Sequence, residues 1–132
     1  MKVVVDTSVW SLSLRKEKPS NHVVVKKLAT LLEDDMDIFI IGVILQEVLQ
    51  AFRHEKTLQK MVKEFDSLPL LTVKKEDYVT AARLHRKCAG KGISAGTVDC
   101  LIASMTVSSG SHLLTADKDF SYIASVSELR LL

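Results

Sequence analysis

The sequence has little cysteine, proline, glycine or aromatic content, and it has no long hydrophobic run. Among its 132 residues are 2 Cys, 2 Pro and 5 Gly, and aromatic side chains make up 5%. Cys88 and Cys100 do not form a CxxC pattern, which excludes a small disulfide-linked secreted scaffold. No apolar segment approaches the roughly 18 residues that cross a bilayer, and Asp6 interrupts the apolar start. These absences predict a cytoplasmic protein with neither a signal peptide nor a membrane span.

A strong charge of either sign is also absent. Lys and Arg number 18 and Asp and Glu number 16, so the formal net charge is +2. This balance does not by itself indicate a nucleic acid partner, which has to be argued from particular residues. The length and the hydrophobic fraction of 47% suit one core and are too small for two ordinary domains. We therefore expect a single domain over residues 1–132.

What is present is an alternation of short aliphatic runs and amphipathic stretches. The runs predict strands at residues 3–5, 38–41, 70–73, 112–115 and 129–132. Apolar residues at helical spacing predict helices at residues 22–33, 43–54, 57–66, 76–89 and 98–107, the last with Thr97 as its N-cap. Strands that alternate with helices are typical of an α/β domain with a central parallel sheet of about five strands flanked by helices.

Two aspartates follow predicted strands. Asp6 comes directly after the first strand, and Asp117 comes after the strand at residues 112–115. In open parallel sheets the carboxyl ends of the strands form the edge where ligands bind. Each aspartate also has a structural alternative, because Asp6 with Thr7 and Ser8 could cap the next helix and Asp117 could form an Asx-turn. Of the neighbouring residues Asp117 and Asp119, Asp119 is interpreted as the turn residue or the supporting residue.

Asp99 and Glu47 lie on predicted helices. The helix of Asp99 is apolar nearly all round, so a carboxylate there needs a cation or a basic partner to offset its burial. Its place in the first helical turn gives it only about 0.3 to 1 kcal/mol from the helix dipole, which is less than the cost of burial. Glu47 lies at the margin of the apolar face of its helix. Alone it would be read as an ordinary surface residue.

A cluster of these carboxylates predicts a site for a hard cation. Carboxylates that crowd together at neutral pH need protons or cations to offset their repulsion. Oxygen ligands without His or Cys favour Mg²⁺, Mn²⁺ or Ca²⁺ over Zn²⁺. The four histidines, His22, His54, His85 and His112, have no zinc-binding spacing and are interpreted as ordinary surface or core residues.

Four motifs, taken in order, resemble the PIN-domain family, and more narrowly the VapC-type toxins of bacterial and archaeal toxin-antitoxin modules. They are residues 3–10 (VVVDTSVW), residues 46–47 (QE), residues 97–103 (TVDCLIA) and residues 114–120 (LTADKDF). Together they span essentially the whole chain.

The resemblance implies a parallel sheet flanked by helices and a Mg²⁺- or Mn²⁺-dependent endoribonuclease that is the toxin of a type II toxin-antitoxin system. It also implies a homodimer and a small VapB-like antitoxin that blocks the site. The residues that match the family's acidic positions, and which we expect to be catalytic and metal-binding, are Asp6, Glu47, Asp99 and Asp117. Ser8 and Thr115 stand where the family often has supporting hydroxyls, and Asp119 joins them as a supporting residue.

An RNA substrate also requires contacts to its phosphates and bases. The basic candidates are Arg15, Lys16, Lys18, Arg83, Arg86, Lys87 and Lys91. Basic residues at a helix end also complement its dipole, so a solvated surface is the alternative interpretation. Trp10 could stack on a base, or it could belong to the core.

Three rival functions remain at this point. The first is a catalytically inactive PIN-like module that binds protein or RNA. The second is a haloacid-dehalogenase-type phosphatase, which would need a second Asp where the chain has Ser8. The third is a receiver domain, for which the acidic pair Asp34 and Asp35 is in the wrong place, after a helix.

Overall fold

Four parallel strands form the centre of the fold, within the described residues 1–14 and 22–132 of the computed structural model. They are β1 (Lys2–Val5), β2 (Asp37–Ile41), β3 (Leu70–Leu71) and β4 (His112–Leu114). Their order in the sheet is β3-β2-β1-β4. In the register, Val3 of β1 lies opposite Ile38 on one side and His112 on the other. This arrangement confirms the predicted α/β class with a parallel sheet.

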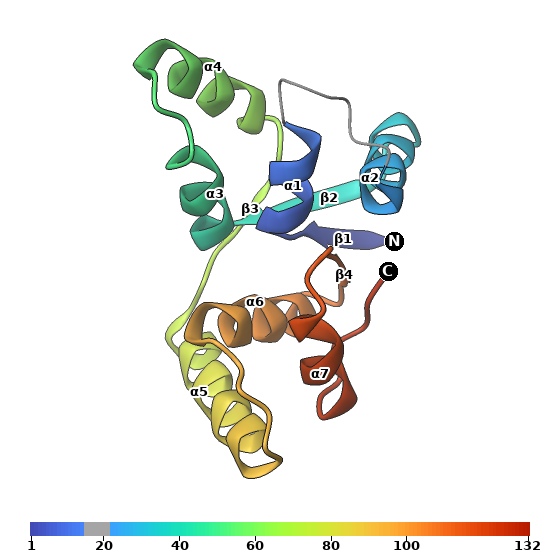
Figure 1. Cartoon of the computed structure of the whole chain (residues 1–132), viewed down its shortest axis with the longest axis vertical. Helices are drawn as coiled ribbons and strands as arrows, with labels where there is room; N and C mark the ends of the chain where they lie inside the picture. The colour runs from blue at the N-terminus through green and yellow to red at the C-terminus, as the bar shows by residue number, and fades with distance from the viewer. Residues whose placement is uncertain (15–21) are drawn as a thin grey trace.

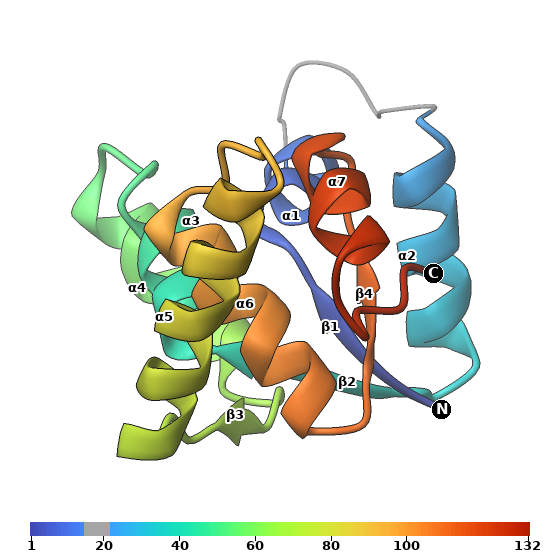
Figure 2. The ribbon, with the colours of Figure 1, turned by 90° about the horizontal axis from the view of Figure 1, so that it is seen from below.

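Helices cover the sheet on both faces, as Figure 1 and the perpendicular view in Figure 2 show. The chain leaves β1 through α1 (Thr7–Ser13) and α2 (Val23–Glu33), and it leaves β2 through α3 (Gly42–Leu49) and α4 (Glu55–Phe65). It then crosses to the other face and forms α5 (Lys75–Gly90), α6 (Thr97–Ser108) and, after β4, α7 (Asp119–Ser125). Right-handed crossovers require this change of face, because β2 and β3 extend the sheet in one direction and β4 extends it in the other.

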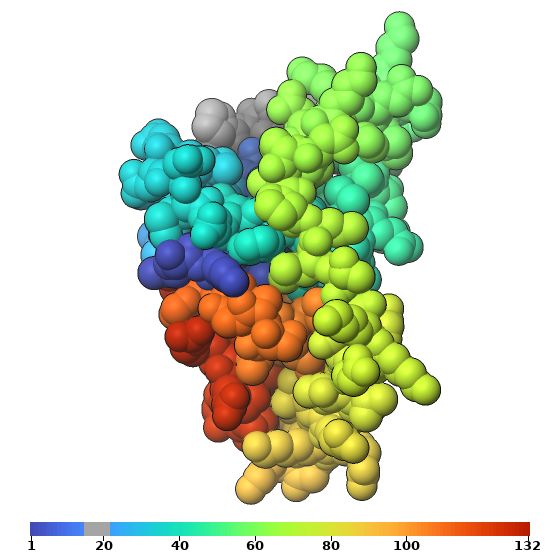
Figure 3. All heavy atoms as spheres, turned by 180° about the vertical axis from the view of Figure 1, so that it is seen from behind, coloured from blue at the N-terminus to red at the C-terminus, as the bar shows by residue number. Residues whose placement is uncertain are grey.

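The segment between α4 and α5 joins the two helix layers. It contains β3, which pairs with β2 at the end of the sheet. Figure 3 shows this segment, in yellow-green, as a continuous band on the surface that runs from the α4 side of the molecule to the α5 side. The sheet edge next to β2 is therefore covered by a short strand and its flanking chain.

The core lies on both faces of the sheet. Val3, Val4 and Val5 are fully buried, as are Leu113 and Leu114 of β4. A strand with helices on both faces has no solvent-facing side, which explains why β1 is an unbroken apolar run instead of an alternating one. Helix α6 is buried nearly all round, from Cys100 to Thr106, as its sequence predicted. Both cysteines are free and buried within this core.

The predicted fifth strand is not formed. Residues 129–132 make one isolated bridge, Leu113 with Leu131, and the only backbone bonds there are Leu113 N to Arg130 O and Leu132 N to Leu113 O, both 2.9 Å. The segment therefore lies along β4 in the parallel sense but is too short to extend the ladder. The described sheet has four strands instead of about five.

Two helix boundaries and one whole helix also differ from the sequence predictions. Helix α3 ends at Leu49, not near residue 54, because the amides of Ala51 and Phe52 turn back to carbonyls three residues earlier. Gly96, not Thr97, is the N-cap of α6. Helix α7 was not predicted, although Phe120 and Ile123 give it a short apolar face that is fully buried.

No helix in the described parts of the chain is both long and apolar enough to cross a membrane.

Candidate metal centre

The carboxyl ends of β1 and β4 lie side by side and carry Asp6 and Asp117. The strand order changes direction here, since the chain goes from β1 to β2 on one side and returns to β4 on the other. Crevices at such switch points are where ligands bind in open parallel sheets. The amide of Asp6 donates to the carbonyl of Leu114 at 2.9 Å, so the two segments remain paired one residue beyond the end of β1.

Asp6 is buried, with 5% of its surface exposed, and its carboxylate is held by two hydroxyls. Oδ2 accepts hydrogen bonds from Ser8 Oγ at 2.8 Å and from Thr115 Oγ1 at 2.9 Å. The side chain makes no capping bond to α1, although its backbone carbonyl accepts from the amides of Val9 and Trp10. The capping alternative for the Asp6 carboxylate is therefore wrong.

The same two hydroxyls order the loop that leads to Asp117. Ser8 Oγ accepts from the amide of Ala116, and Thr115 Oγ1 accepts from the amide of Asp117, each at 3.0 Å. Each hydroxyl thus donates to Asp6 and accepts from the backbone after β4, which uses both kinds of bond that a hydroxyl offers. Ser8 and Thr115 consequently couple the position of Asp117 to that of Asp6.

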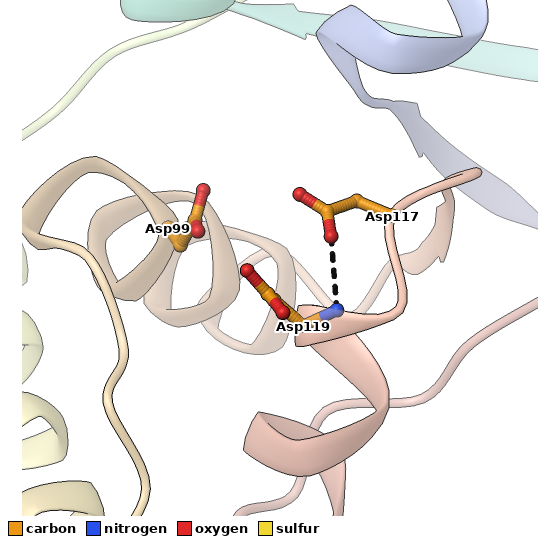
Figure 4. Close-up of side chains that lie close together, drawn as sticks. All are labelled: Asp99, Asp117 and Asp119. Atoms are coloured by element: carbon orange, nitrogen blue, oxygen red, sulfur yellow. Dashed lines mark hydrogen bonds between the residues drawn. The ribbon is translucent and has the colours of Figure 1, made fainter.

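Asp99, Asp117 and Asp119 form a close group of carboxylates. One oxygen from each lies within 4.8 Å of the others. Figure 4 shows the three side chains pointing toward a shared space, Asp99 from α6 and the other two from the loop after β4 and the start of α7. Asp99 is half-buried, whereas Asp117 and Asp119 are exposed. No His or Cys belongs to a comparable group in the described residues.

Asp117 also forms the turn that its alternative interpretation predicted. Its Oδ1 accepts from the amide of Asp119 at 2.9 Å (Figure 4). The turn and the acidic group are compatible because this bond uses one carboxylate oxygen and leaves the other without a hydrogen bond among the described residues. The turn also brings Asp119 into the group. The sequence had assigned Asp119 only a turn or supporting role, because it did not reveal α7, whose first residue is Asp119.

Glu47 projects from α3 and lies outside this group of three. It is half-buried, and its Oε1 accepts a hydrogen bond from Thr7 Oγ1 at 3.0 Å. Asp6 also lies outside the group. The group within 4.8 Å therefore holds two of the four residues expected from the sequence, Asp99 and Asp117, together with Asp119. Asp6 and Glu47 are linked to it through the effect of their charges on Asp99.

The other four carboxylates nonetheless act electrostatically on Asp99. The pKa of Asp99 is raised from 3.8 to about 6, first by burial and then by the negative charges of Asp117, Asp6, Asp119 and Glu47. Every charged group that shifts this pKa is another carboxylate, so no Lys or Arg in the described chain offsets the repulsion. A divalent cation would offset it, and an all-oxygen donor set suits Mg²⁺ or Mn²⁺.

The candidate RNA-binding residues have less support. Arg83, Arg86, Lys87 and Lys91 are exposed on or just after α5, while Arg15, Lys16 and Lys18 lie outside the described residues. Trp10 is 7% exposed and packs edge-on against Phe65, with ring centres 5.0 Å apart. This packing favours the core interpretation of Trp10 over base stacking.

Comparison with known proteins agrees with the fold. The sequence profile of the family described as PIN domain matches residues 3–126. Ribonuclease VapC11 of Mycobacterium tuberculosis and VapC ribonuclease Mb1587 of Mycobacterium bovis are each 28% identical over 130 residues, which cover 97% of this chain and 96% of theirs.

Solved structures show the same fold. VapBC2 from Rickettsia felis, bound to a DNA fragment from its promoter, has a chain similar to this one with a TM-score of 0.78 and 20% identity, covering 100% of this chain and 98% of that one. VapBC-1 from nontypeable Haemophilus influenzae gives a TM-score of 0.77 at 14% identity, with coverage of 100% and 97%.

Proposed function

We propose that this chain, which belongs to the PIN domain family, is a metal-dependent endoribonuclease and the toxin of a type II toxin-antitoxin pair. The observation that carries the proposal is the group of Asp99, Asp117 and Asp119 at the carboxyl edge of the sheet, with Asp6 and Glu47 close enough to raise the pKa of Asp99. The relatives named as ribonucleases, which match nearly the full length of the chain, support RNA as the substrate.

The residues present fit a divalent cation of the Mg²⁺ or Mn²⁺ kind. Asp99 and Asp117 would hold it, with Asp119 beside them, and Asp6 and Glu47 would complete the site through direct or water-mediated contacts. When bound, such an ion supplies positive charge to the phosphate oxygens and makes a bound water more acidic.

The chain's own residues supply position and hydrogen bonds. Asp6 is fixed by two hydroxyl donors, which limits its movement when the charge around it changes. Glu47 has one oxygen engaged by Thr7, and the other, Oε2, makes no hydrogen bond in the described chain. Oε2 of Glu47 therefore remains available to the site, where it would contact the cation directly or through a water.

A small antitoxin and a second copy of the chain are the proposed partners. The similar structures named VapBC support the first. The expectation of a homodimer comes from the family resemblance alone. We propose that the protein acts in the cytoplasm, where its RNA substrates are.

RNA cleavage by the purified protein tests the enzyme proposal. The wild type is expected to cut RNA with Mg²⁺ or Mn²⁺ and to stop when EDTA is added, while Asp6→Asn and Asp99→Asn lose most of the activity. Asp37→Asn is a matched control because Asp37 is an exposed carboxylate at the start of β2, the opposite end of the sheet. A wild type that binds RNA without cutting any member of a broad panel would support the inactive binding module instead.

A further inference from the structure

The side chains of Thr7 and Glu47 meet although 40 residues separate them in the chain. Thr7 is the first residue of α1, Glu47 lies on α3, and the two helices pack against each other. Oγ1 of Thr7 donates to Oε1 of Glu47 at 3.0 Å, and both residues are half-buried. The sequence suggested only a possible part in helix capping for Thr7.

This bond differs from those made by most other hydroxyls of the protein. Serine and threonine in helices usually donate to a backbone carbonyl three or four residues earlier. Residues that do so here include Ser13, Thr30, Ser67, Thr80, Thr106 and Ser108. Thr7 begins its helix, so no helical carbonyl precedes it, and its hydroxyl is free to reach a side chain on another element.

The contact restricts a flexible carboxylate at the edge of the acidic group. A glutamate has three side-chain torsions, and holding it in one conformation costs entropy unless a partner fixes it. Thr7 has a single proton to donate and uses it on Oε1, while Oε2 makes no hydrogen bond among the described residues. The negative charge of Glu47 acts on Asp99, so this carboxylate lies within electrostatic reach of the group.

We propose that Thr7 is a positioning residue whose hydroxyl fixes Glu47 and keeps its second oxygen available to a divalent cation held at Asp99 and Asp117. The inference rests on the proposed function, because it assumes the metal centre. Thr7 itself does not contact the cation or the RNA in this scheme. Its effect is therefore on the affinity and geometry of the site, and it passes through Glu47.

The test measures Mn²⁺ binding directly, from the spin-resonance signal of the free ion, and does not depend on cleavage. Thr7→Val keeps the shape and removes the hydroxyl, and it is expected to weaken Mn²⁺ binding by about 10-fold, the size seen for partners of metal ligands. Thr7→Ser keeps the hydroxyl and should stay close to wild type. Thr80→Val is the matched control, since the Thr80 hydroxyl bonds only to the local carbonyl of Glu76 on α5.

A second pair of variants separates positioning from a structural effect. In a Glu47→Ala background, Thr7→Val should change Mn²⁺ affinity no further, because the carboxylate that Thr7 positions is gone. Melting temperatures in EDTA identify any variant that is merely unstable, and Thr7→Ala provides another hydroxyl-free chain if Thr7→Val does not fold.

The outcomes distinguish this inference from the proposed function. If Thr7→Val and Thr7→Ala bind Mn²⁺ as the wild type does, while Glu47→Ala binds it more weakly, Thr7 has no positioning role and the metal centre stands. Wild-type affinity in Glu47→Ala would also overturn the role of Thr7. If the wild type binds no Mn²⁺ at all, the metal centre itself is wrong.

Discussion

Thr115 Oγ1 donates a 2.9 Å hydrogen bond to Oδ2 of Asp6, which joins residues that are 109 positions apart. The bond ties the end of β1 to the loop after β4, and Ser8 adds a second donor to the same oxygen. The acidic centre is thus built across two adjacent strands of the sheet. Its geometry depends on polar contacts as well as on the fold.

The first prediction concerns this bond. Thr115→Val should lower the free energy of unfolding by about 1.5 to 3 kcal/mol, the usual range for a hydrogen bond to a charged group. Urea denaturation in EDTA measures the change. Thr30→Val should have a much smaller effect, because the exposed Thr30 bonds only to the carbonyl of Lys26 on its own helix. An equal loss of stability in the two variants would show that the hydrogen bond from the Thr115 hydroxyl to Asp6 contributes no more than an ordinary surface hydrogen bond.

The second prediction concerns Asp99 and pH in the absence of metal. Its pKa in the folded chain is about 6, above the ordinary 3.8, so the folded state binds this proton more tightly than the unfolded state does. Ionisation of Asp99 therefore destabilises the fold, progressively between these two values and fully above about pH 6. Asp99→Asn removes the penalty and should melt at a higher temperature than wild type at about pH 7.5, with the difference vanishing at about pH 4.

Thermal denaturation in EDTA at the two pH values checks this directly. Asp37→Asn serves as the control, since it removes a carboxylate at the far end of the sheet. A variant Asp99→Asn that is less stable than wild type at neutral pH would contradict the idea that crowded negative charge is the dominant effect at this position.

The third prediction is that a divalent metal makes the wild type more stable than Asp99→Asn, which reverses their order of stability without metal. Mn²⁺ at about 1,000 times its dissociation constant should stabilise the wild type by about 4.1 kcal/mol, and it should stabilise Asp99→Asn far less. The affinity should fall as the pH drops below about 6, because Asp99 must lose its proton to bind a cation. Melting curves with and without Mn²⁺ measure the stabilisation. An equal rise in both proteins would place the ion elsewhere.

The fourth prediction concerns α7, which carries Asp119 at its first residue. Phe120 is completely buried, so Phe120→Ala should cost about 3 to 5 kcal/mol of stability. Tyr122 is an aromatic residue on the same helix with 57% of its surface exposed, and Tyr122→Ala should change stability by less than about 0.5 kcal/mol. Chemical denaturation separates the two. Similar values would mean that α7 does not anchor the loop after β4 through Phe120.

Much of the fold could be predicted because buried strands carry a strong local signal. The run Val3 to Val5 and the run Ile38 to Ile41 each identify a strand, and the end of a strand fixes where the next carboxylate lies. Asp6 and Asp117 could therefore be assigned to one edge of the sheet. Asp99 could be singled out because a charge on an apolar helix is unusual.

The remaining features depend on tertiary contacts that a local pattern does not contain. Asp119 joins the acidic group only because α7 begins there and the Asp117 turn directs it toward Asp99. The bond from Thr7 to Glu47 requires the packing of α1 on α3, which no spacing in the sequence reveals. The segment at residues 129–132 has the composition of a strand, yet it makes only one bridge to β4.

The pairing of β1 with β4 also has a consequence for synthesis. β1 leaves the ribosome well before its partner at residues 112–114 does. A nascent chain that ends before residue 112 contains Asp6, Glu47 and Asp99 but lacks the strand that brings Asp117 and Asp119 beside them. Contacts between distant residues also form late, because the long intervening loop must close first. The acidic centre is therefore completed only after residues 112–119 have left the ribosome.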